Sequence, residues 1–222
     1  METGNQVFYD RTEAGQLLAS SLLPYRDLRP LVVALPRGGV VVGAEVAKAL
    51  SAPLDVLVTR KIGAPDNPEF GVGAIAMGGI MVFDPASMNA LGLTFSDLRE
   101  TIDRETAELE RRLDVYRGNR HNLQVDGKIV ILVDDGLATG LTAQAAAESI
   151  RFGNPGKLIF AAPVGSGEAV AKLRPKVDEL VCLRGLDLYV SVGAAYRHFP
   201  QLTDKEVIDA LVRAHREIKV RL

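Results

Sequence analysis

The 222-residue sequence predicts an α/β fold, in which helices flank a parallel β-sheet. The prediction depends on two observations. Short apolar runs of strand length alternate with longer segments of helical periodicity, and repeated β-α-β units of this kind build parallel sheets covered on both faces. The run 129–133, Ile-Val-Ile-Leu-Val, is also apolar throughout and rich in β-branched residues, as expected of a strand buried on both faces.

Capping and turn residues delimit the elements of the N-terminal half. A first helix at 10–23 begins with Asp10 and Glu13 in capping-box spacing. A strand at 31–35, a helix at 40–50 and a strand at 54–58 follow. The runs 71–77 and 80–83 are predicted to pair antiparallel through Gly78-Gly79, since two adjacent glycines suit a tight turn. The highly charged segment 97–117 has apolar residues at helical spacing and is predicted to be a long helix.

In the C-terminal half the same alternation continues. After the strand at 129–133, the predicted helices are 143–152 and 167–173, and the predicted strands are 158–162 and 179–183. A last helix begins at Thr203, which has Glu206 three residues later in capping-box spacing, and extends towards 220.

Two adjacent carboxylates, Asp134 and Asp135, follow the central apolar run. They are expected at the carboxyl end of a buried strand, where open α/β sheets place their ligands. The loop after them contains two glycines and two threonines and leads into a predicted helix, whose first N–H groups are suited to bind an anion. The segment therefore combines acceptors for sugar hydroxyls or a metal with donors for a phosphate, which together suit a phosphorylated sugar.

The run 133–142, Val-Asp-Asp-Gly-Leu-Ala-Thr-Gly-Leu-Thr, resembles the phosphoribosyl pyrophosphate (PRPP) motif of the type I phosphoribosyltransferases. The resemblance implies that Asp134 and Asp135 hold the ribose 2′- and 3′-hydroxyls and, directly or indirectly, a Mg²⁺ ion. It also implies that the following loop wraps the 5′-phosphate with Ala138, Thr139, Gly140, Leu141 and Thr142. The alternative, solvated acids before a glycine-containing turn, does not explain why Thr139, Gly140 and Thr142 all stand where a phosphate loop needs them.

The resemblance also implies an architecture. Residues 1–222 would form a single domain of type I phosphoribosyltransferase fold, with a core at about 28–184. A small hood would come from about 185–200 together with the terminal helices. The family analogy further implies a homodimer.

A second candidate loop, Pro36-Arg37-Gly38-Gly39, follows the first predicted sheet strand. A cation followed by two glycines suits an anion loop, because the backbone can approach the anion closely. An ordinary turn is the alternative. Beside the PRPP motif, the segment resembles the family's pyrophosphate loop, which implies that Arg37, Gly38 and Gly39 contact the diphosphate and that the Pro36–Arg37 peptide bond is cis.

Residues 59–70 contain two cations and then several loop formers, and we expect a loop. The family has a mobile loop at this place, which closes over the pyrophosphate, so Arg60 and Lys61 become the catalytic candidates. The alternative is a solvated surface loop. The pattern Arg-Lys-Ile-Gly-Ala-Pro at 60–65 also resembles a bacterial branch of the family.

The segment 188–199 carries the base-binding candidate, Tyr189, followed by a Val-Gly step at 192–193. In purine-using relatives an aromatic residue here stacks on the base; a packing aromatic is the alternative. Oxopurine-using relatives have an aspartate where Ala138 stands and another shortly after the Val-Gly step, where this chain has Ala194-Ala195-Tyr196. The phosphate loop is therefore more similar to the adenine and orotate branches.

Composition limits the other function classes. The net charge is −2 and the pI about 6.0, which does not suggest a nucleic-acid partner. The sequence has neither the Gly-Lys-Ser/Thr of a Walker A loop nor the Gly-x-Gly-x-x-Gly of a dinucleotide fold. No apolar run approaches the length of a membrane span, the first residues do not form a secretory signal, and the single cysteine, Cys182, excludes an internal disulfide. The cytoplasm is the expected compartment.

The resemblance implies a Mg²⁺-dependent transferase of nucleotide metabolism. It would move the phosphoribosyl group, a glycosyl transfer, from PRPP to a nitrogen acceptor such as a nucleobase and release pyrophosphate. One alternative is a non-catalytic regulator of the same fold that senses PRPP. Another is a fragment of a larger hydrolase–transferase fusion, although the sequence has no Gly-x-Ser-x-Gly elbow.

Overall fold

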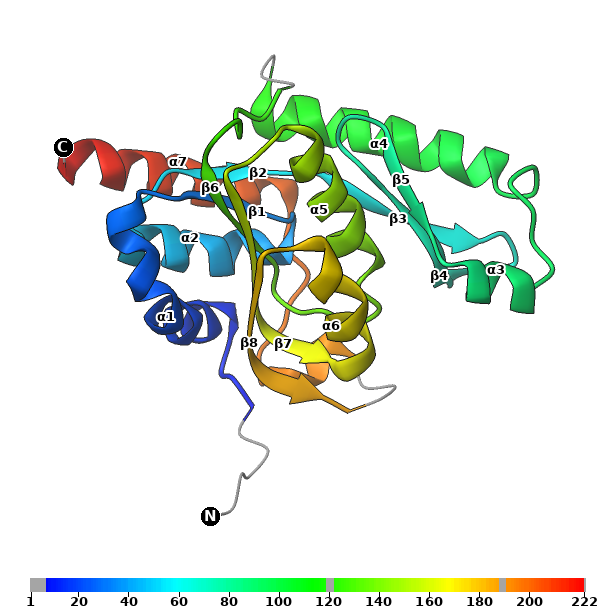
Figure 1. Cartoon of the computed structure of the whole chain (residues 1–222), viewed down its shortest axis with the longest axis horizontal. Coiled ribbons are helices and arrows are strands. Elements are labelled where there is room, and N and C mark those ends of the chain that lie inside the picture. The colour runs from blue at the N-terminus through cyan, green and yellow to red at the C-terminus, as the bar shows by residue number, and fades with distance from the viewer. Residues whose placement is uncertain (1–6, 119–121, 188–190, 222) are drawn as a thin grey trace.

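The computed structural model describes residues 7–118, 122–187 and 191–221. Within them, five parallel strands form the main sheet in the order β2-β1-β6-β7-β8. These strands are β1 (Leu31–Ala34), β2 (Leu54–Val56), β6 (Ile129–Val133), β7 (Lys157–Ser166) and β8 (Glu179–Leu186). Helices cover both faces of this sheet (Figure 1), which confirms the α/β prediction.

The central strand β6 explains the apolar run at 129–133. Its residues from Val130 to Val133 are fully buried, because helices pack on both sides. One side holds α1 (Arg11–Leu22) and α2 (Gly38–Leu50), with α7 (Asp204–Arg221) beside α2. The other side holds α5 (Leu141–Phe152) and α6 (Gly167–Leu173). Three short 3₁₀ helices, η1 (Leu23–Leu28), η2 (Arg174–Lys176) and η3 (Val192–Ala195), lie in the connections.

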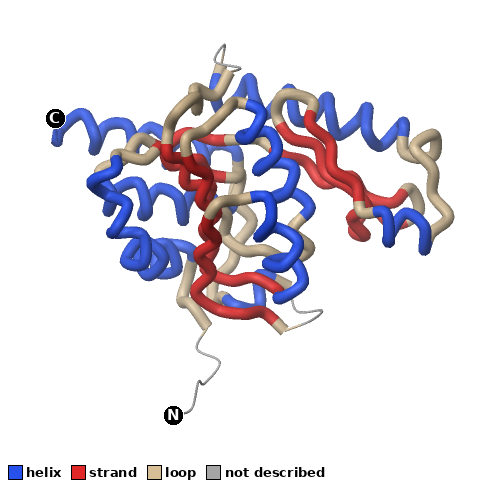
Figure 2. The backbone as a smooth tube through the Cα atoms, in the orientation of Figure 1, coloured by secondary structure: helices blue, strands red, loops and turns tan. Residues whose placement is uncertain are grey.

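A smaller antiparallel sheet extends away from the main sheet (Figure 2). Its strands are β3 (Thr59–Ala64), β4 (Asn67–Ala76) and β5 (Ile80–Phe83), in that order. Strand β4 turns into β5 through Gly78 and Gly79, both with positive φ, which confirms the predicted antiparallel pairing. The helices α3 (Pro85–Ala90) and α4 (Arg99–Arg117) follow.

The expectation of a loop at 59–70 is wrong, because β3 and the start of β4 form a hairpin there. The loop-forming residues mark irregularities within that hairpin. Pairing shifts register on both sides of Gly63, and a β-carbon on this glycine would lie 2.3 Å from the carbonyl oxygen of Pro68. Packing of the hairpin against α4 and α5 therefore outweighs the local tendency of glycine and proline to form loops.

Candidate functional site

The acid pair lies at the carboxyl end of β6, beside the loop that follows β1. These two strands are neighbours in the sheet, so Asp134 and Asp135 meet the Pro36–Gly39 loop directly. A β-carbon on Gly38 would lie 1.7 Å from Oδ2 of Asp135, and one on Gly39 would lie 2.9 Å from Cα of Asp134. The structure thus brings together two segments about 100 residues apart in sequence that the family resemblance assigned to one ligand.

The Pro36–Gly39 loop leads straight into a helix. Arg37 is the N-cap residue of α2, and Gly38 and Gly39 form its first turn. The Pro36–Arg37 peptide bond is cis, as the family resemblance implied. The free N–H groups of a helix start and the adjacent guanidinium can bind an anion here.

Burial sets the electrostatics of the acid pair. It raises the pKa of Asp134 well above the ordinary carboxyl value, and the neighbouring Asp135 raises it further. Burial also raises the pKa of Asp135, while the Arg11 guanidinium acts in the opposite direction. The backbone N–H of Asp135 donates a 2.8 Å hydrogen bond to Oδ1 of Asp134. Two carboxylates held this closely in a buried site favour ligands that bring hydrogen-bond donors or positive charge.

Arg11, at the start of α1, is a site residue that the sequence did not reveal. Its Nε donates a 2.7 Å hydrogen bond to Oδ2 of Asp135, and its Nη1 donates a 2.9 Å bond to the carbonyl of Pro200. The guanidinium carbon also lies 3.6 Å from the ring centroid of Phe199. No local motif marks Arg11, because its partners are more than 120 residues away in sequence.

The loop after the acid pair leads into a helix that no side chain caps. Gly140 has φ of +78° and is the N-cap residue of this helix, α5. Ala138 and Thr139 are exposed, while the loop is anchored from behind by Ser166. The Ser166 hydroxyl donates a 2.7 Å bond to the carbonyl of Ala138, and its N–H donates a 2.9 Å bond to that of Leu137. The first N–H groups of α5 therefore have no side-chain acceptor and are oriented towards the loop.

We predict that residues 138–142 hold a sulfate or phosphate ion in crystals grown with either anion. The donors would be backbone N–H groups of the loop and the hydroxyls of Thr139 and Thr142, since these groups surround the uncapped start of α5. A crystal structure checks this. An anion ordered elsewhere, with the loop empty, would contradict the assignment.

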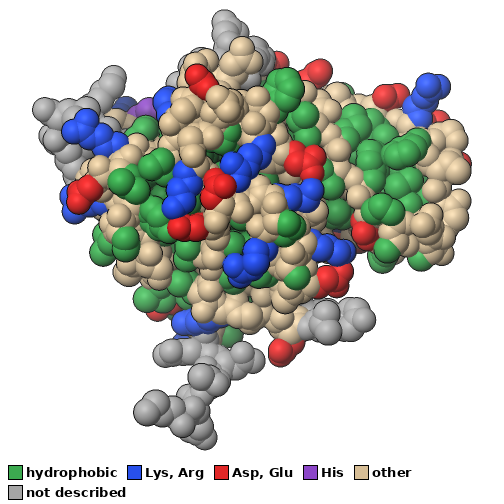
Figure 3. Space-filling model, viewed as in Figure 1, with side chains coloured by type: hydrophobic (Ala, Val, Ile, Leu, Met, Phe, Trp, Pro, Cys, Tyr) green, Lys and Arg blue, Asp and Glu red, His purple; other side chains and the backbone are tan. Residues whose placement is uncertain are grey.

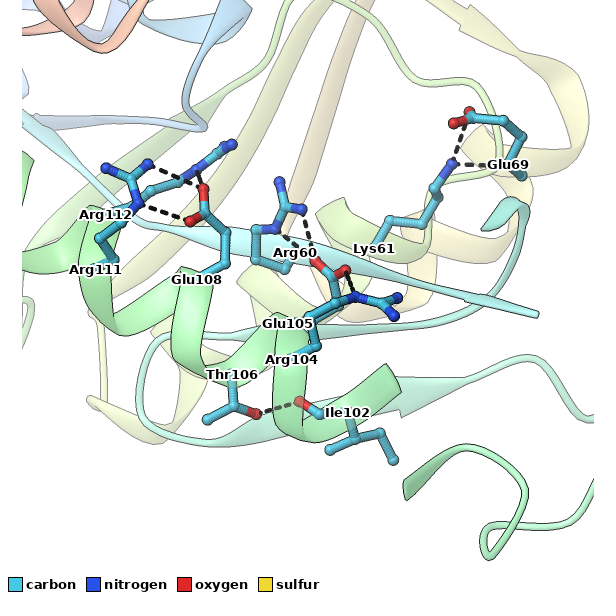
Figure 4. Close-up of polar contacts among 10 residues, drawn as sticks. All are labelled: Arg60, Lys61, Glu69, Ile102, Arg104, Glu105, Thr106, Glu108, Arg111 and Arg112. Atoms are coloured by element: carbon cyan, nitrogen blue, oxygen red, sulfur yellow. Dashed lines mark hydrogen bonds and ion pairs between the residues drawn. The ribbon is translucent and has the colours of Figure 1, made fainter. Parts of the chain in front are cut away.

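The predicted catalytic cations lie on β3, and carboxylates bind both of them (Figure 4). Arg60 pairs with Glu105 of α4. Its Nε and Nη2 atoms lie 2.8 Å and 2.6 Å from Oε2 of Glu105. Lys61 pairs with the exposed Glu69 of β4 at 3.1 Å. Figure 4 also shows Arg104 on the other oxygen of Glu105. Either cation must leave, or share, its carboxylate to meet a phosphate.

Residues 192–200, here called the hood, lie against the acid pair. A β-carbon on Gly136 would lie 2.3 Å from Val192, and the Tyr196 hydroxyl donates a 2.5 Å bond to the carbonyl of Asp135. The N-terminal segment joins this hood, because Phe8 exchanges backbone hydrogen bonds of 2.8 Å with Ala195 and Arg197. The base-binding candidate Tyr189 lies outside the described residues.

The residues of the acid pair fit the Mg²⁺ ion that the family resemblance implied. Among the described residues, no group of three or more His, Cys, Asp or Glu side chains could hold a metal ion. Mg²⁺ is commonly bound by one or two carboxylates together with water and substrate phosphates, and Asp134 and Asp135 provide this number of carboxylates.

No described helix is long and apolar enough to cross a membrane.

Comparison with known proteins places the chain in a family. The sequence model described as "Phosphoribosyl transferase domain" matches residues 12–192. A Mycobacterium tuberculosis protein named "Putative phosphoribosyl transferase Rv0571c" is 41% identical over 212 residues, which cover 96% of this chain and 48% of the relative. The chain thus spans about half the length of the curated relatives it matches.

Solved structures share the fold of this chain. The crystal structure of TT1426 from Thermus thermophilus has a TM-score of 0.75 and 40% identity, and the match covers 93% of this chain and 98% of that one. A protein from Aquifex aeolicus, AQ2163, shares the fold at 14% identity and a TM-score of 0.51, covering 90% of this chain and 84% of that one. The family match over residues 12–192 shows that the chain belongs to the phosphoribosyl transferase domain family.

Proposed function

We propose that the protein transfers the phosphoribosyl group from PRPP to a nitrogen acceptor, such as a nucleobase, and releases pyrophosphate. One observation carries the proposal: the acid pair packs directly on the Pro36–Gly39 loop, with a carboxylate oxygen of Asp135 against Gly38. The loop at 138–142 begins three residues further along the chain. One ligand that carries a diol between a monophosphate and a diphosphate would satisfy all three features, and PRPP has these groups.

The residues have separable roles in this proposal. Asp134 and Asp135 bind the ribose 2′- and 3′-hydroxyls, the loop Ala138–Thr142 binds the 5′-phosphate, and Arg37 to Gly39 bind the diphosphate. The ribose becomes oxocarbenium-like as the diphosphate leaves, so positioning and charge stabilisation supply most of the catalysis. Mg²⁺, held through Asp134 and Asp135 or the water around them, would neutralise charge on the diphosphate.

Arg60 is proposed to stabilise the leaving diphosphate, and its variant gives a specific prediction. Arg60→Met should weaken PRPP binding about tenfold or more, the loss expected for a hydrogen bond to a charged group. Binding of ribose 5-phosphate should not change, because that ligand lacks the diphosphate. Arg104→Met is the matched control, since Arg104 shares Glu105 but its side chain is 61% exposed. Calorimetry in which both ligands lose affinity equally would contradict this role for Arg60.

A pyrophosphate-release assay tests the proposed activity. Labelled PRPP and Mg²⁺ are incubated with the protein and a panel of purines, pyrimidines and other nitrogen acceptors. At least one acceptor should be converted to its phosphoribosyl product, with one pyrophosphate released for each. PRPP that binds without being consumed by any acceptor would instead support the regulator.

The distribution of surface charge is relevant to the alternative of a PRPP-sensing regulator. On the face shown in Figure 3, acidic and basic side chains are interspersed and do not gather into a basic patch. A nucleic-acid-binding regulator would need such a patch. The ligand-binding features already described are common to both hypotheses, so the assay decides between them.

A further inference from the structure

We infer that Arg11 is a positioning residue that holds the Asp135 carboxylate in place for the ribose, and that the hood holds Arg11. This inference rests on the proposed function, since it concerns the same PRPP site. Arg11 acts on the ribose only through Asp135 and does not contact the ligand itself.

The contacts of Arg11 fix both the carboxylate and the guanidinium. Nε of Arg11 lies 2.7 Å from Oδ2 of Asp135, and the two side chains are 9% and 16% exposed. The same oxygen also faces Gly38, where a β-carbon would lie 1.7 Å away. Asp135 is therefore held between the pyrophosphate loop and the guanidinium, with little freedom to rotate.

The hood fixes Arg11 through a stack of rings. Phe199 lies under the guanidinium, with 3.6 Å from Cζ to the ring centroid, and stacks on Tyr196 with centroids 4.8 Å apart. Tyr196 in turn packs against Phe8, at 5.6 Å between centroids. The carbonyl of Pro200 accepts the bond from Nη1. A guanidinium that stacks on a ring face and also donates a hydrogen bond from its edge has little freedom to move, as a positioning group requires.

Arg11 and its partners come from opposite ends of the chain. Arg11 begins α1, whereas Tyr196, Phe199 and Pro200 follow η3. Their contacts connect the hood to the carboxylate that would bind the ribose.

Separate titrations with PRPP and inorganic pyrophosphate, both without Mg²⁺, test the inference by calorimetry. Arg11→Met should weaken PRPP binding about tenfold and leave pyrophosphate binding within about twofold, because only PRPP brings a ribose to Asp135 and no metal ion then links Asp135 to the diphosphate. Arg11→Lys should recover much of the loss, since it restores the charge. Arg26→Met is the control: Arg26 lies in the same N-terminal region, but its side chain contacts Ser51 at 3.4 Å instead of the acid pair. Equal losses for both ligands in Arg11→Met, or no loss for PRPP, would overturn the inference.

A double-mutant cycle tests the role of the ring. Phe199→Leu should weaken PRPP binding about threefold in the wild-type background and have no further effect in the Arg11→Met background. Additive effects would show that Phe199 does not act through Arg11 and would overturn that part of the inference.

A ligand-free cycle separates this inference from the proposed function. Wild-type protein that does not bind PRPP would overturn the proposed function. The melting temperatures of Arg11→Met, Asp135→Asn and the double variant would still report on the pair: the double variant should be no less stable than Asp135→Asn alone. Additive losses would overturn the positioning of Asp135 by Arg11 whatever the ligand is.

Discussion

Asp135→Asn should weaken PRPP binding by about 1–3 kcal/mol and destabilise the protein by a smaller amount, because burial raises the pKa of the Asp135 carboxyl and so offsets part of the ion pair with Arg11. The loss of stability follows because the variant leaves the Arg11 guanidinium, whose side chain is 9% exposed, without its anionic partner. The loss of affinity follows because an amide accepts fewer and weaker hydrogen bonds from the ribose hydroxyls. Denaturant unfolding and calorimetry measure the two effects separately.

Asp134→Asn is the matched variant, and its stability should change in the other direction. No ion pair holds Asp134 among the described contacts, and burial and Asp135 both raise its pKa. A carboxyl whose folded-state pKa is raised contributes stability that is complete below its unfolded pKa and is lost as the pH rises through the folded pKa. Without Mg²⁺, Asp134→Asn should therefore gain stability over the wild type as the pH rises above about 4, while PRPP binding still weakens. Two results would contradict these roles of the acid pair. One is a stability difference between Asp134→Asn and the wild type that shrinks with rising pH. The other is unchanged PRPP affinity in both Asp134→Asn and Asp135→Asn.

Gly38→Ala should reduce PRPP binding to a small fraction of the wild-type level. The new methyl group would lie 1.7 Å from Oδ2 and 2.5 Å from Cγ of Asp135, so the loop or the carboxylate must move. The carboxylate cannot move freely, because Arg11 holds the same oxygen. Overpacking of this kind costs about 1–3 kcal/mol and displaces both ligand-binding segments at once.

Gly185→Ala provides the control for this variant, since a β-carbon there would meet no atom within 4 Å. It should keep both the stability and the PRPP affinity of the wild type. If Gly38→Ala is folded and binds PRPP as tightly as Gly185→Ala, the contact between the loop and the acid pair is not part of the ligand site.

The sequence predicted the main sheet because its strands are short apolar runs bounded by turns. The run at 129–133 is apolar since both faces of β6 are covered, and this cause is local enough to be visible in the sequence. The hairpin at 59–76 was predicted only in part. Gly63, Pro65 and Pro68 suggested a loop, and the packing of β3 and β4 against distant helices is a tertiary effect that no local pattern contains.

The candidate site shows the same division. The loop at 138–142 has a motif of its own, the Pro36–Gly39 loop was interpreted beside that motif, and the adjacency of the two segments follows from the pairing of β1 with β6. Arg11 could not be predicted, since a single arginine in a helix start has many ordinary explanations. The partners of Arg60 were also not predictable, because Glu105 is one of many acids in a charged helix and only the packing of α4 on β3 brings it close.

The central claim is that the acid pair, the 138–142 loop and the Arg37–Gly39 loop bind one ligand. A crystal structure of the protein with PRPP and Mg²⁺ tests this claim most directly. The ribose hydroxyls should lie within hydrogen-bond distance of Asp134 and Asp135 or of a metal ion that they hold. The 5′-phosphate should lie at Ala138 to Thr142, and the diphosphate at Arg37 to Gly39. PRPP ordered at another place, with the acid pair free of ligand, would contradict the claim.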